Sequence, residues 1–229
     1  MRSIVLGDTF EELLKIESSS IDLILTDPPY FISRDSGFKS GKSKKYNIID
    51  IDFGEWDKGS FDLEFLFREY YRVLKKGGTL IFFYDIWKST EVKQVADFYK
   101  FKQPRVCQWV KTNPVPVNSS VNYLSNSTEY FFTFVKGSKP TFNSKYDNGL
   151  YSYPICHGKE RTKHPTQKPL SLINELIKKH SNPNDTILDT FGGSGTTAVS
   201  CVENDRNFII IEKDLEFYNI INDRINNLK

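Results

Sequence analysis

The stretch that most constrains this chain is residues 21–31, where an apolar run ends in an acid, two prolines and an aromatic residue. The run before Asp27 has the length and β-branched content of a buried strand. Pro28 and Pro29 end that strand, because neither can donate a ladder hydrogen bond and both hold φ at about −65°. Asp27 is therefore expected at the carboxyl end of a strand, where open α/β sheets bind ligands. Tyr30 follows it on a stiff, extended backbone.

A second ligand-binding pattern occupies residues 187–197, which read as a strand, the glycine loop FGGSGTT and the start of a helix. Glycines allow a ligand to approach the backbone closely, and free N–H groups at a helix start favour its anionic part. Glu212 ends the next predicted strand, at the place where a carboxylate would accept both hydroxyls of a ribose. The segment predicts the nucleoside-binding half of a doubly wound fold.

Glycine loops also occur in two other kinds of nucleotide site. Residues 193–198 fit the NAD pattern G-x-G-x-x-A, which is weak by itself. A P-loop for ATP or GTP is excluded, because no lysine follows the glycines in the form G-K-[ST].

The order of elements predicts one α/β domain over residues 1–229, with a mainly parallel sheet covered on both faces. Strands are expected over 3–6, 23–25, 79–84, 106–110, 130–135, 186–188 and 208–211. Helices are expected over 10–16, 61–74, 85–101, 170–179, 197–203 and 215–228. The strands over 106–110 and 130–135 are expected to form an antiparallel pair. The first two strands, ending at Asp8 and Asp27, are expected to be neighbours with both carboxylates at one edge.

The ends of the first two helices have recognisable signals. Thr9 is expected to cap the first helix, and Lys75 and Lys76 followed by two glycines are expected to end the second.

The composition of the chain bears on where the protein is found. No apolar run approaches the roughly 18 residues that span a bilayer, and no signal peptide is recognisable. Three isolated cysteines indicate a reducing compartment and argue against a structural zinc site, so we expect a cytoplasmic protein without a metal.

Two segments without helix or strand periodicity are rich in cations. Residues 33–60 are polar and rich in Gly, Ser and Lys, and residues 136–168 mix cations with aromatic residues. Such a surface suits nucleic acid, although a charge run is more often only a solvated face. The net charge of +2 does not itself identify a partner. The predicted DNA contacts are Arg34, Lys39, Lys42, Lys44, Lys45, Lys139, Lys145, Arg161 and Lys163.

The motifs Asp-Pro-Pro-Tyr (27–30) and FGGSGTT (191–197) occur together in this sequence. With both motifs, the chain resembles the S-adenosylmethionine-dependent methyltransferases that act on exocyclic amino groups of DNA bases. Two further segments, HPTQKP (164–169) and WVKTNP (109–114), are similar to segments of that family. The catalytic motif precedes the cofactor loop, as in the family's permuted beta group. This order implies a catalytic half over about 1–135, a target-recognition insert over about 136–163 and a cofactor-binding half over about 164–229. Gly192-Gly193 departs from relatives that often carry a bulkier residue there.

The resemblance implies roles for individual residues. Asp27 and the Pro28 carbonyl would accept hydrogen bonds from the target amine, Pro29 would stiffen the loop, and Tyr30 would stack on a flipped-out base. Glu212 would hold the ribose, and Asp8 with Thr9 would meet the adenosine end of the cofactor. The expected cofactor site comprises Asp8, Thr9, Asp27, His164, Thr166, Lys168, Asp189, Phe191, Gly192, Gly193, Ser194, Gly195, Thr196, Thr197, Glu212 and Lys213.

The expected activity is site-specific methylation of adenine N6 in double-stranded DNA, because relatives that act on adenine usually carry Asp at the first motif position and those that act on cytosine N4 usually carry Ser. Cytosine N4 stays an alternative. Less favoured are methylation of a protein glutamine, by relatives with Asn at position 27, and a non-catalytic DNA-binding homologue, whose motifs would be broken. The sequence leaves open a homodimer, a cognate restriction endonuclease and the recognition site.

Overall fold

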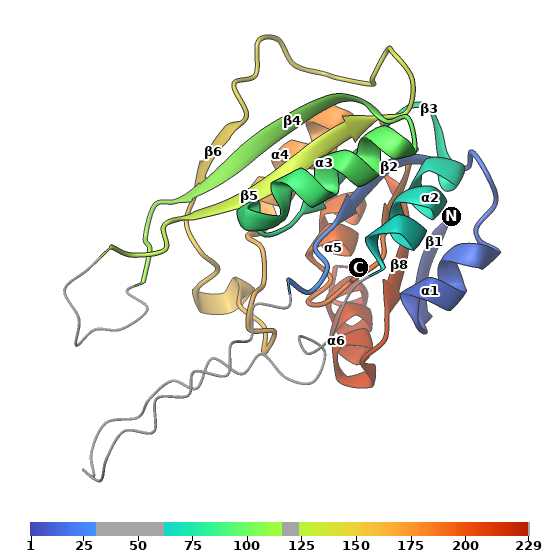
Figure 1. Cartoon of the computed structure of the whole chain (residues 1–229). Coiled ribbons are helices and arrows are strands. Elements are labelled where there is room, and N and C mark those ends of the chain that lie inside the picture. Colours follow the sequence, from blue (N-terminus) through green and yellow to red (C-terminus); the bar gives the residue numbers. More distant parts are fainter. Residues whose placement is uncertain (31–61, 116–123, 229) are drawn as a thin grey trace, which may run out of the picture.

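The computed structural model describes residues 1–30, 62–115 and 124–228. Eight strands in these residues form one sheet of order β1-β8-β7-β2-β3-β5-β4-β6 (Figure 1). They are β1 (Arg2–Leu6), β2 (Ile21–Thr26), β3 (Leu74–Phe83), β4 (Lys102–Lys111), β5 (Thr128–Val135), β6 (Leu150–Tyr153), β7 (Thr186–Asp189) and β8 (Asn207–Glu212). β1, β8, β7, β2 and β3 run parallel, whereas β5 is antiparallel to both β3 and β4. The expected α/β class with an antiparallel pair is confirmed.

Helices cover both faces of this sheet (Figure 1). They are α1 (Thr9–Glu12), η1 (Leu13–Lys15), α2 (Leu63–Val73), η3 (Ile86–Lys88), α3 (Ser89–Phe98), η4 (Gly158–Glu160), α4 (Leu170–His180), α5 (Thr196–Glu203) and α6 (Leu215–Asn226). Side chains of α2 and α3 pack with Ile24 and Phe82 on one face, and those of α4, α5 and α6 pack with Leu25 and Phe83 on the other. β2 and β3 thus alternate their side chains between two apolar layers. No helix of the described ranges is long and apolar enough to cross a membrane.

Four local expectations are corrected by the structure. β1 and β2 are not neighbours, because β8 and β7 lie between them, although their carboxyl ends do share one edge. The cap of α1 is the Asp8 side chain, which accepts from Phe10 N, and not Thr9. Lys75 and Lys76 do not end α2 but lie inside β3. The helix expected over 85–101 is divided into η3 and α3, and β6 was not foreseen.

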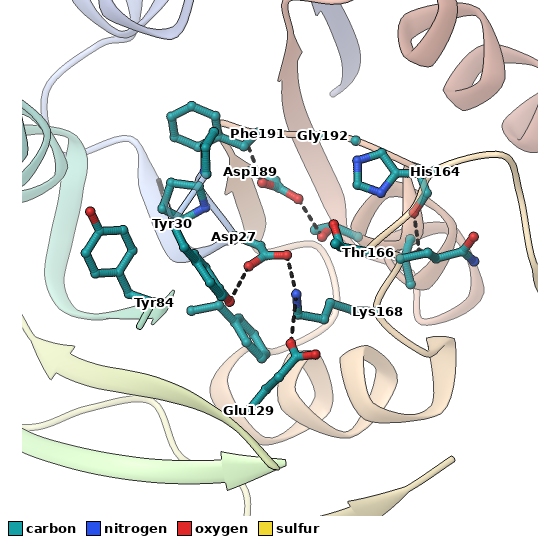
Figure 2. Close-up of a pocket in the computed structure, with 18 of the residues that line it drawn as sticks. Asp27, Tyr30, Tyr84, Glu129, His164, Thr166, Lys168, Asp189, Phe191 and Gly192 are labelled. Atoms are coloured by element: carbon teal, nitrogen blue, oxygen red, sulfur yellow. Dashed lines mark hydrogen bonds and ion pairs between the residues drawn. The ribbon is translucent and has the colours of Figure 1, made fainter. Parts of the chain in front are cut away.

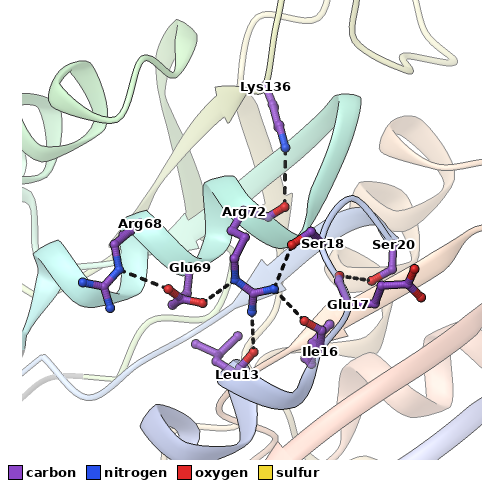
Figure 3. Close-up of polar contacts among 9 residues, drawn as sticks. All are labelled: Leu13, Ile16, Glu17, Ser18, Ser20, Arg68, Glu69, Arg72 and Lys136. Atoms are coloured by element: carbon purple, nitrogen blue, oxygen red, sulfur yellow. Dashed lines mark hydrogen bonds and ion pairs between the residues drawn. The ribbon is translucent and has the colours of Figure 1, made fainter.

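Glycine is required where β3 begins beside β2. A Cβ at Gly78 would lie 2.9 Å from the Asp22 carbonyl oxygen, and Gly77 has φ +89°. The connection before β2 is held by Arg72 of α2, whose guanidinium donates to the carbonyls of Leu13 and Ile16 at 2.8 and 2.7 Å (Figure 3). Buried backbone carbonyls need such partners, so this arginine fixes the entry into the strand that carries Asp27.

Candidate active site

Four carboxylates meet at one edge of the sheet because the strands before them run in parallel. Asp8 follows β1, Asp27 follows β2, Asp189 ends β7 and Glu212 ends β8. All four line a cavity of about 1640 Å³. The carboxyl edge of the sheet is therefore the candidate site that both sequence motifs predict.

The Asp27–Tyr30 segment forms one wall of this cavity (Figure 2). The Tyr30 hydroxyl donates to Asp27 Oδ1 at 2.7 Å, and its ring packs edge-on against Tyr84, with the centroids 5.7 Å apart. Burial raises the pKa of Tyr30 well above its usual value, so the phenol stays a donor. Tyr84, which follows β3, was not singled out from the sequence.

The second oxygen of Asp27 pairs with a lysine from a distant part of the chain. Lys168 Nζ donates to Asp27 Oδ2 and lies 3.1 Å from Glu129 Oε2 (Figure 2). Glu129, in β5, also pairs with Lys111 of β4 at 2.9 Å. The structure thus ties Lys168, expected beside the cofactor, directly to Asp27. Glu129 was missed, although its partner Lys111 belongs to the WVKTNP segment already noted.

The charges in this cluster depend on one another. Burial raises the pKa of Asp27, Lys168 lowers it and Glu129 raises it again, leaving it above the ordinary value. Burial lowers the pKa of Lys168, but the attraction of both carboxylates outweighs that effect and raises it. Burial raises the pKa of Glu129, but the nearby ammonium groups of Lys168 and Lys111 bring it below normal. The protonation of Asp27, Lys168 and Glu129 is therefore coupled through their mutual contacts.

The glycine loop (191–197) follows Asp189, whose side chain accepts hydrogen bonds from both ends of the loop. Asp189 Oδ1 accepts from Phe191 N at 3.1 Å, and Oδ2 accepts from the Thr197 hydroxyl at 2.7 Å. Burial raises the pKa of Asp189 to about 7. Gly195 caps α5 with φ +77°, a conformation that glycine adopts without strain. Ser194 and Thr196 share a hydrogen bond of 3.0 Å on the cavity wall.

Glu212 joins the loop to the end of β8. It accepts from Gly193 N at 2.6 Å and from Asp214 N at 2.8 Å, and burial raises its pKa. His164 lies over the same loop, since a Cβ at Gly193 would come within 2.9 Å of its Nε2 atom. Burial lowers the pKa of His164 to about 4, so its ring is neutral near pH 7.

The remaining expected cofactor residues lie on the same cavity. Thr166 and Gly192 line it, and Lys213 pairs with Asp8 at 2.9 Å. Thr9 donates to the Thr190 carbonyl at 2.5 Å. The structure thus brings together every residue of the predicted cofactor site except that Gly195 is not part of the cavity wall itself.

A hydroxyl network beneath the cavity was not apparent in the sequence. The Thr190 hydroxyl lies 3.0 Å from that of Thr26 and 2.7 Å from that of Tyr70. Thr26 ends β2, Thr190 follows β7 and Tyr70 comes from α2. The network therefore fixes the two motif-bearing strands relative to each other.

The predicted DNA contacts divide into three groups. Arg34, Lys39, Lys42, Lys44 and Lys45 lie outside the described residues. Arg161 lines the cavity, and Lys163 pairs with Glu216 of α6 at 3.1 Å. Lys139 lies beside Gly77, and Lys145 lies between two residues, Asn143 and Asp147, that contact the last turn of α4. Lys139 and Lys145 are thus at the edge of the sheet opposite Asp27.

Comparison with known proteins identifies the family. A family model described as DNA methylase matches residues 21–223. The chain belongs to the DNA methylase family. Type II methyltransferase M2.MboI of Moraxella bovis is 35% identical over 92% of this chain and 82% of its own length. Type II methyltransferase M.HinfI of Haemophilus influenzae is 31% identical over 100% of this chain and 69% of its own length.

Solved structures agree with this assignment. The crystal structure of M1.HpyAVI in complex with SAM, S-adenosylmethionine, has a TM-score of 0.75 and 30% identity, covering 99% of this chain and 100% of that one. The cytosine-N4-specific PvuII DNA methyltransferase also has a TM-score of 0.75, at 19% identity over 97% of this chain and 85% of its own, which is a likeness of fold alone.

This DNA methylase is an S-adenosylmethionine-dependent methyltransferase, and its cavity has the chemistry to hold that cofactor. S-adenosylmethionine carries a sulfonium and an ammonium group. The cavity presents the carboxylates of Asp8, Asp27, Asp189 and Glu212. A cationic nucleoside ligand therefore fits the residues present.

Proposed function

We propose that this DNA methylase transfers a methyl group to the N6 atom of adenine at specific sites in double-stranded DNA. The observation that carries the proposal is the position of Asp27, which faces the same cavity as the glycine loop and Glu212. A carboxylate at that position can accept a hydrogen bond from an exocyclic amine, and the glycine loop with Glu212 would hold the cofactor in the same cavity. The Asp at the first motif position supports adenine over cytosine.

The chain's own residues have a defined task in this reaction. When bound, S-adenosylmethionine supplies an electrophilic methyl group on a positively charged sulfur. The adenine amine is a poor nucleophile because its lone pair is delocalised into the ring. Asp27 and the Pro28 carbonyl accept hydrogen bonds from its N–H groups, orient the lone pair and stabilise positive charge developing on nitrogen. Methyl transfer would form the nitrogen–carbon bond while the carbon–sulfur bond of the cofactor breaks and its electron pair stays on sulfur. One amine proton would then pass to solvent.

The target base must leave the duplex to reach this cavity. Tyr30 and Tyr84 provide aromatic surface on the wall beside Asp27, and we assign Tyr30 as the stacking face. Arg161, exposed at the cavity, is the described cation best placed for a backbone phosphate. On the cofactor side, we assign Glu212 to the ribose, and Asp189 with the glycine loop to the methionine portion.

The direct test is to methylate DNA in vitro, digest it to nucleosides and identify the product by mass spectrometry. We expect N6-methyladenine from the wild-type protein and none from Asp27→Ala with its fold preserved. N4-methylcytosine in its place would establish the cytosine alternative, which shares the exocyclic amine chemistry. Labelling of protein and not of DNA would establish the glutamine alternative.

Three further proposals concern the surroundings of this enzyme. The Type II names of the relatives support a restriction endonuclease of the same specificity as a partner. A DNA substrate supports a cytoplasmic location. We keep a homodimer as a proposal, to be tested by light scattering with and without DNA.

A further inference from the structure

We propose that Lys168 and Glu129 act as a positioning pair that sets the orientation and the charge of the Asp27 carboxylate. The inference rests on the proposed function, since it gives Asp27 a hydrogen-bonding role in the chemistry. Neither residue is assigned to touch the target base or to carry the reaction. Each acts through Asp27.

The surroundings of Lys168 shield its ammonium from most of the solvent. The Lys168 side chain is only 8% exposed and lies between the two carboxylates (Figure 2). Its ammonium is 5.8 Å from the Tyr30 ring centroid and 5.2 Å from that of Phe83. An ammonium placed among two aromatic rings and two carboxylates has little freedom to move. It therefore fixes Asp27 Oδ2 in one position.

Tyr30 fixes the other oxygen of Asp27, so the carboxylate plane is determined at both ends. The three residues come from different elements: Tyr30 follows Asp27 in the chain, Lys168 precedes α4 and Glu129 lies in β5. A carboxylate held in this way can meet the target amine with one lone-pair direction already selected. Pre-orientation of this kind is a large part of what enzymes contribute to a bimolecular reaction.

The charge of Asp27 is set by the groups that face it. Lys168 stabilises the anion, whereas Glu129 and the more distant Asp189 are carboxylates and oppose it. Tyr30 donates to it, and Lys111 acts only through Glu129. Glu129 also shares the Lys168 ammonium, so that Asp27 is not neutralised by a cation of its own. Asp27 thereby keeps acceptor strength toward the target amine.

This arrangement predicts opposite effects for the two members of the pair. Without Lys168, Asp27 loses its paired ammonium and still faces the Glu129 carboxylate, so the pKa of Asp27 rises. Without the Glu129 charge, Lys168 pairs with Asp27 alone, so the pKa of Asp27 falls and its acceptor strength decreases. A residue that only maintained the fold would not shift the pH profile in a defined direction.

The experiment compares wild type, Lys168→Met, Lys168→Arg and Glu129→Gln by single-turnover methylation of DNA between pH 5.5 and 8.5. The cofactor is saturating, so that titration of Asp189 on the cofactor side does not limit the rate. For Lys168→Met we expect the acid limb to move up by about 1–3 pH units. We also expect the rate on the plateau to fall by about 10–100-fold, as for partners that orient a functional group.

For Glu129→Gln we expect the plateau rate to fall by about tenfold, while the rate at pH 5.5 relative to pH 8.5 increases. Lys168→Arg should keep the wild-type acid limb. Glu175→Gln is the matched control. Glu175 also pairs with a lysine, Lys179, at 2.5 Å, but it does not line the cavity. It should leave the profile unchanged.

Folding is checked by circular dichroism and by calorimetric binding of S-adenosylmethionine. If Lys168→Met does not fold, Glu129→Gln and Lys168→Arg decide the question by the same profiles. If the acid limb moves in the same direction in Lys168→Met and Glu129→Gln, or moves in neither, the proposal of a positioning pair is wrong. A wild-type protein that does not methylate DNA overturns the proposed function instead, so the two failures are distinguishable.

Discussion

Two lysines near opposite ends of α4 each pair with one aspartate and one glutamate, but in different surroundings. Lys168 lies just before the helix and pairs with Asp27 and Glu129. Lys179 lies in its last turn and pairs with Asp147 and Glu175, both at 2.5 Å. Each ammonium is near a tyrosine ring whose hydroxyl donates to one of its carboxylates, Tyr30 to Asp27 and Tyr151 to Asp147.

The two clusters differ in what remains for another molecule to bind. Asp147 accepts from Gly149 N at 2.8 Å, from the Tyr151 hydroxyl at 3.1 Å and from Lys179. Burial raises its pKa, but these hydrogen bonds outweigh that effect and leave it below the ordinary value. Among the residues that the structure describes, Asp27 accepts from two donors. It lines the cavity, and burial leaves its pKa raised.

The same set of residue types therefore serves two purposes. Around Lys179 the donors satisfy the carboxylate and join the segment before β6 to α4, which is a structural connection. Around Lys168 one direction of the carboxylate stays open to a cavity of ligand size. Acceptor capacity that faces a cavity, and not the presence of an ion pair, distinguishes the chemical site from the structural one.

Asp27→Asn should have the largest effect on this comparison. The amide keeps the size of the side chain but loses the charge that stabilises the developing cation, so turnover should fall by about 10²–10⁴-fold. Asp147→Asn is the matched control and should leave turnover within about twofold. Steady-state methylation of DNA is the measurement. Equal losses in the two variants would remove the distinction between the clusters.

Glu212 tests whether a carboxylate with several backbone partners still serves a ligand when it lines the cavity. Glu212→Ala should weaken binding of S-adenosylmethionine by about 1.5–3 kcal/mol, the usual scale for hydrogen bonds to a charged group. Isothermal calorimetry provides the value. Unchanged affinity would place Glu212 with Asp147 as a structural carboxylate and would remove it from the cofactor site.

Asp189 extends the comparison to pH. Because burial raises its pKa to about 7, it is protonated in the free folded protein below that pH. A cationic cofactor favours the anion, so its affinity should fall as pH drops below about 7, by up to about tenfold per pH unit. Asp189→Asn should bind more weakly and lose this dependence. Calorimetry at pH 5.5, 6.5 and 7.5 tests this expectation, which a flat wild-type profile would contradict.

Lys179→Met should have the smallest effect, and on stability alone. Its side chain is 18% exposed, so we expect the free energy of unfolding to fall by about 1–2 kcal/mol. Urea denaturation measures the loss, and turnover under native conditions should be unchanged. A decrease in turnover with stability preserved would show that the two clusters are coupled through α4.

Much of the site was predictable because its motifs are local. Pro28 and Pro29 end a strand wherever they occur, and they therefore placed Asp27 at a strand end without knowledge of the fold. Gly193 and Gly195 have positive φ, as expected for a glycine loop that turns from a strand into a helix. The positions of Asp27 and the glycine loop thus follow from stiffness and freedom of the backbone, which are properties of a few consecutive residues, whereas their expected roles come from the family resemblance.

Tertiary structure alone decided which distant residues meet. β8 and β7 pair between β1 and β2, so the two amino-terminal strands are not neighbours, although they follow each other in the sequence. Lys168 pairs with Asp27 from 141 positions away in the sequence, and Glu129 joins the cluster through Lys168. A run of cations looks the same in sequence whether it faces the cavity, as Arg161 does, or the opposite edge, as Lys139 does. Backbone propensity acts over a few residues, whereas strand order and ion pairing depend on packing of the whole sheet.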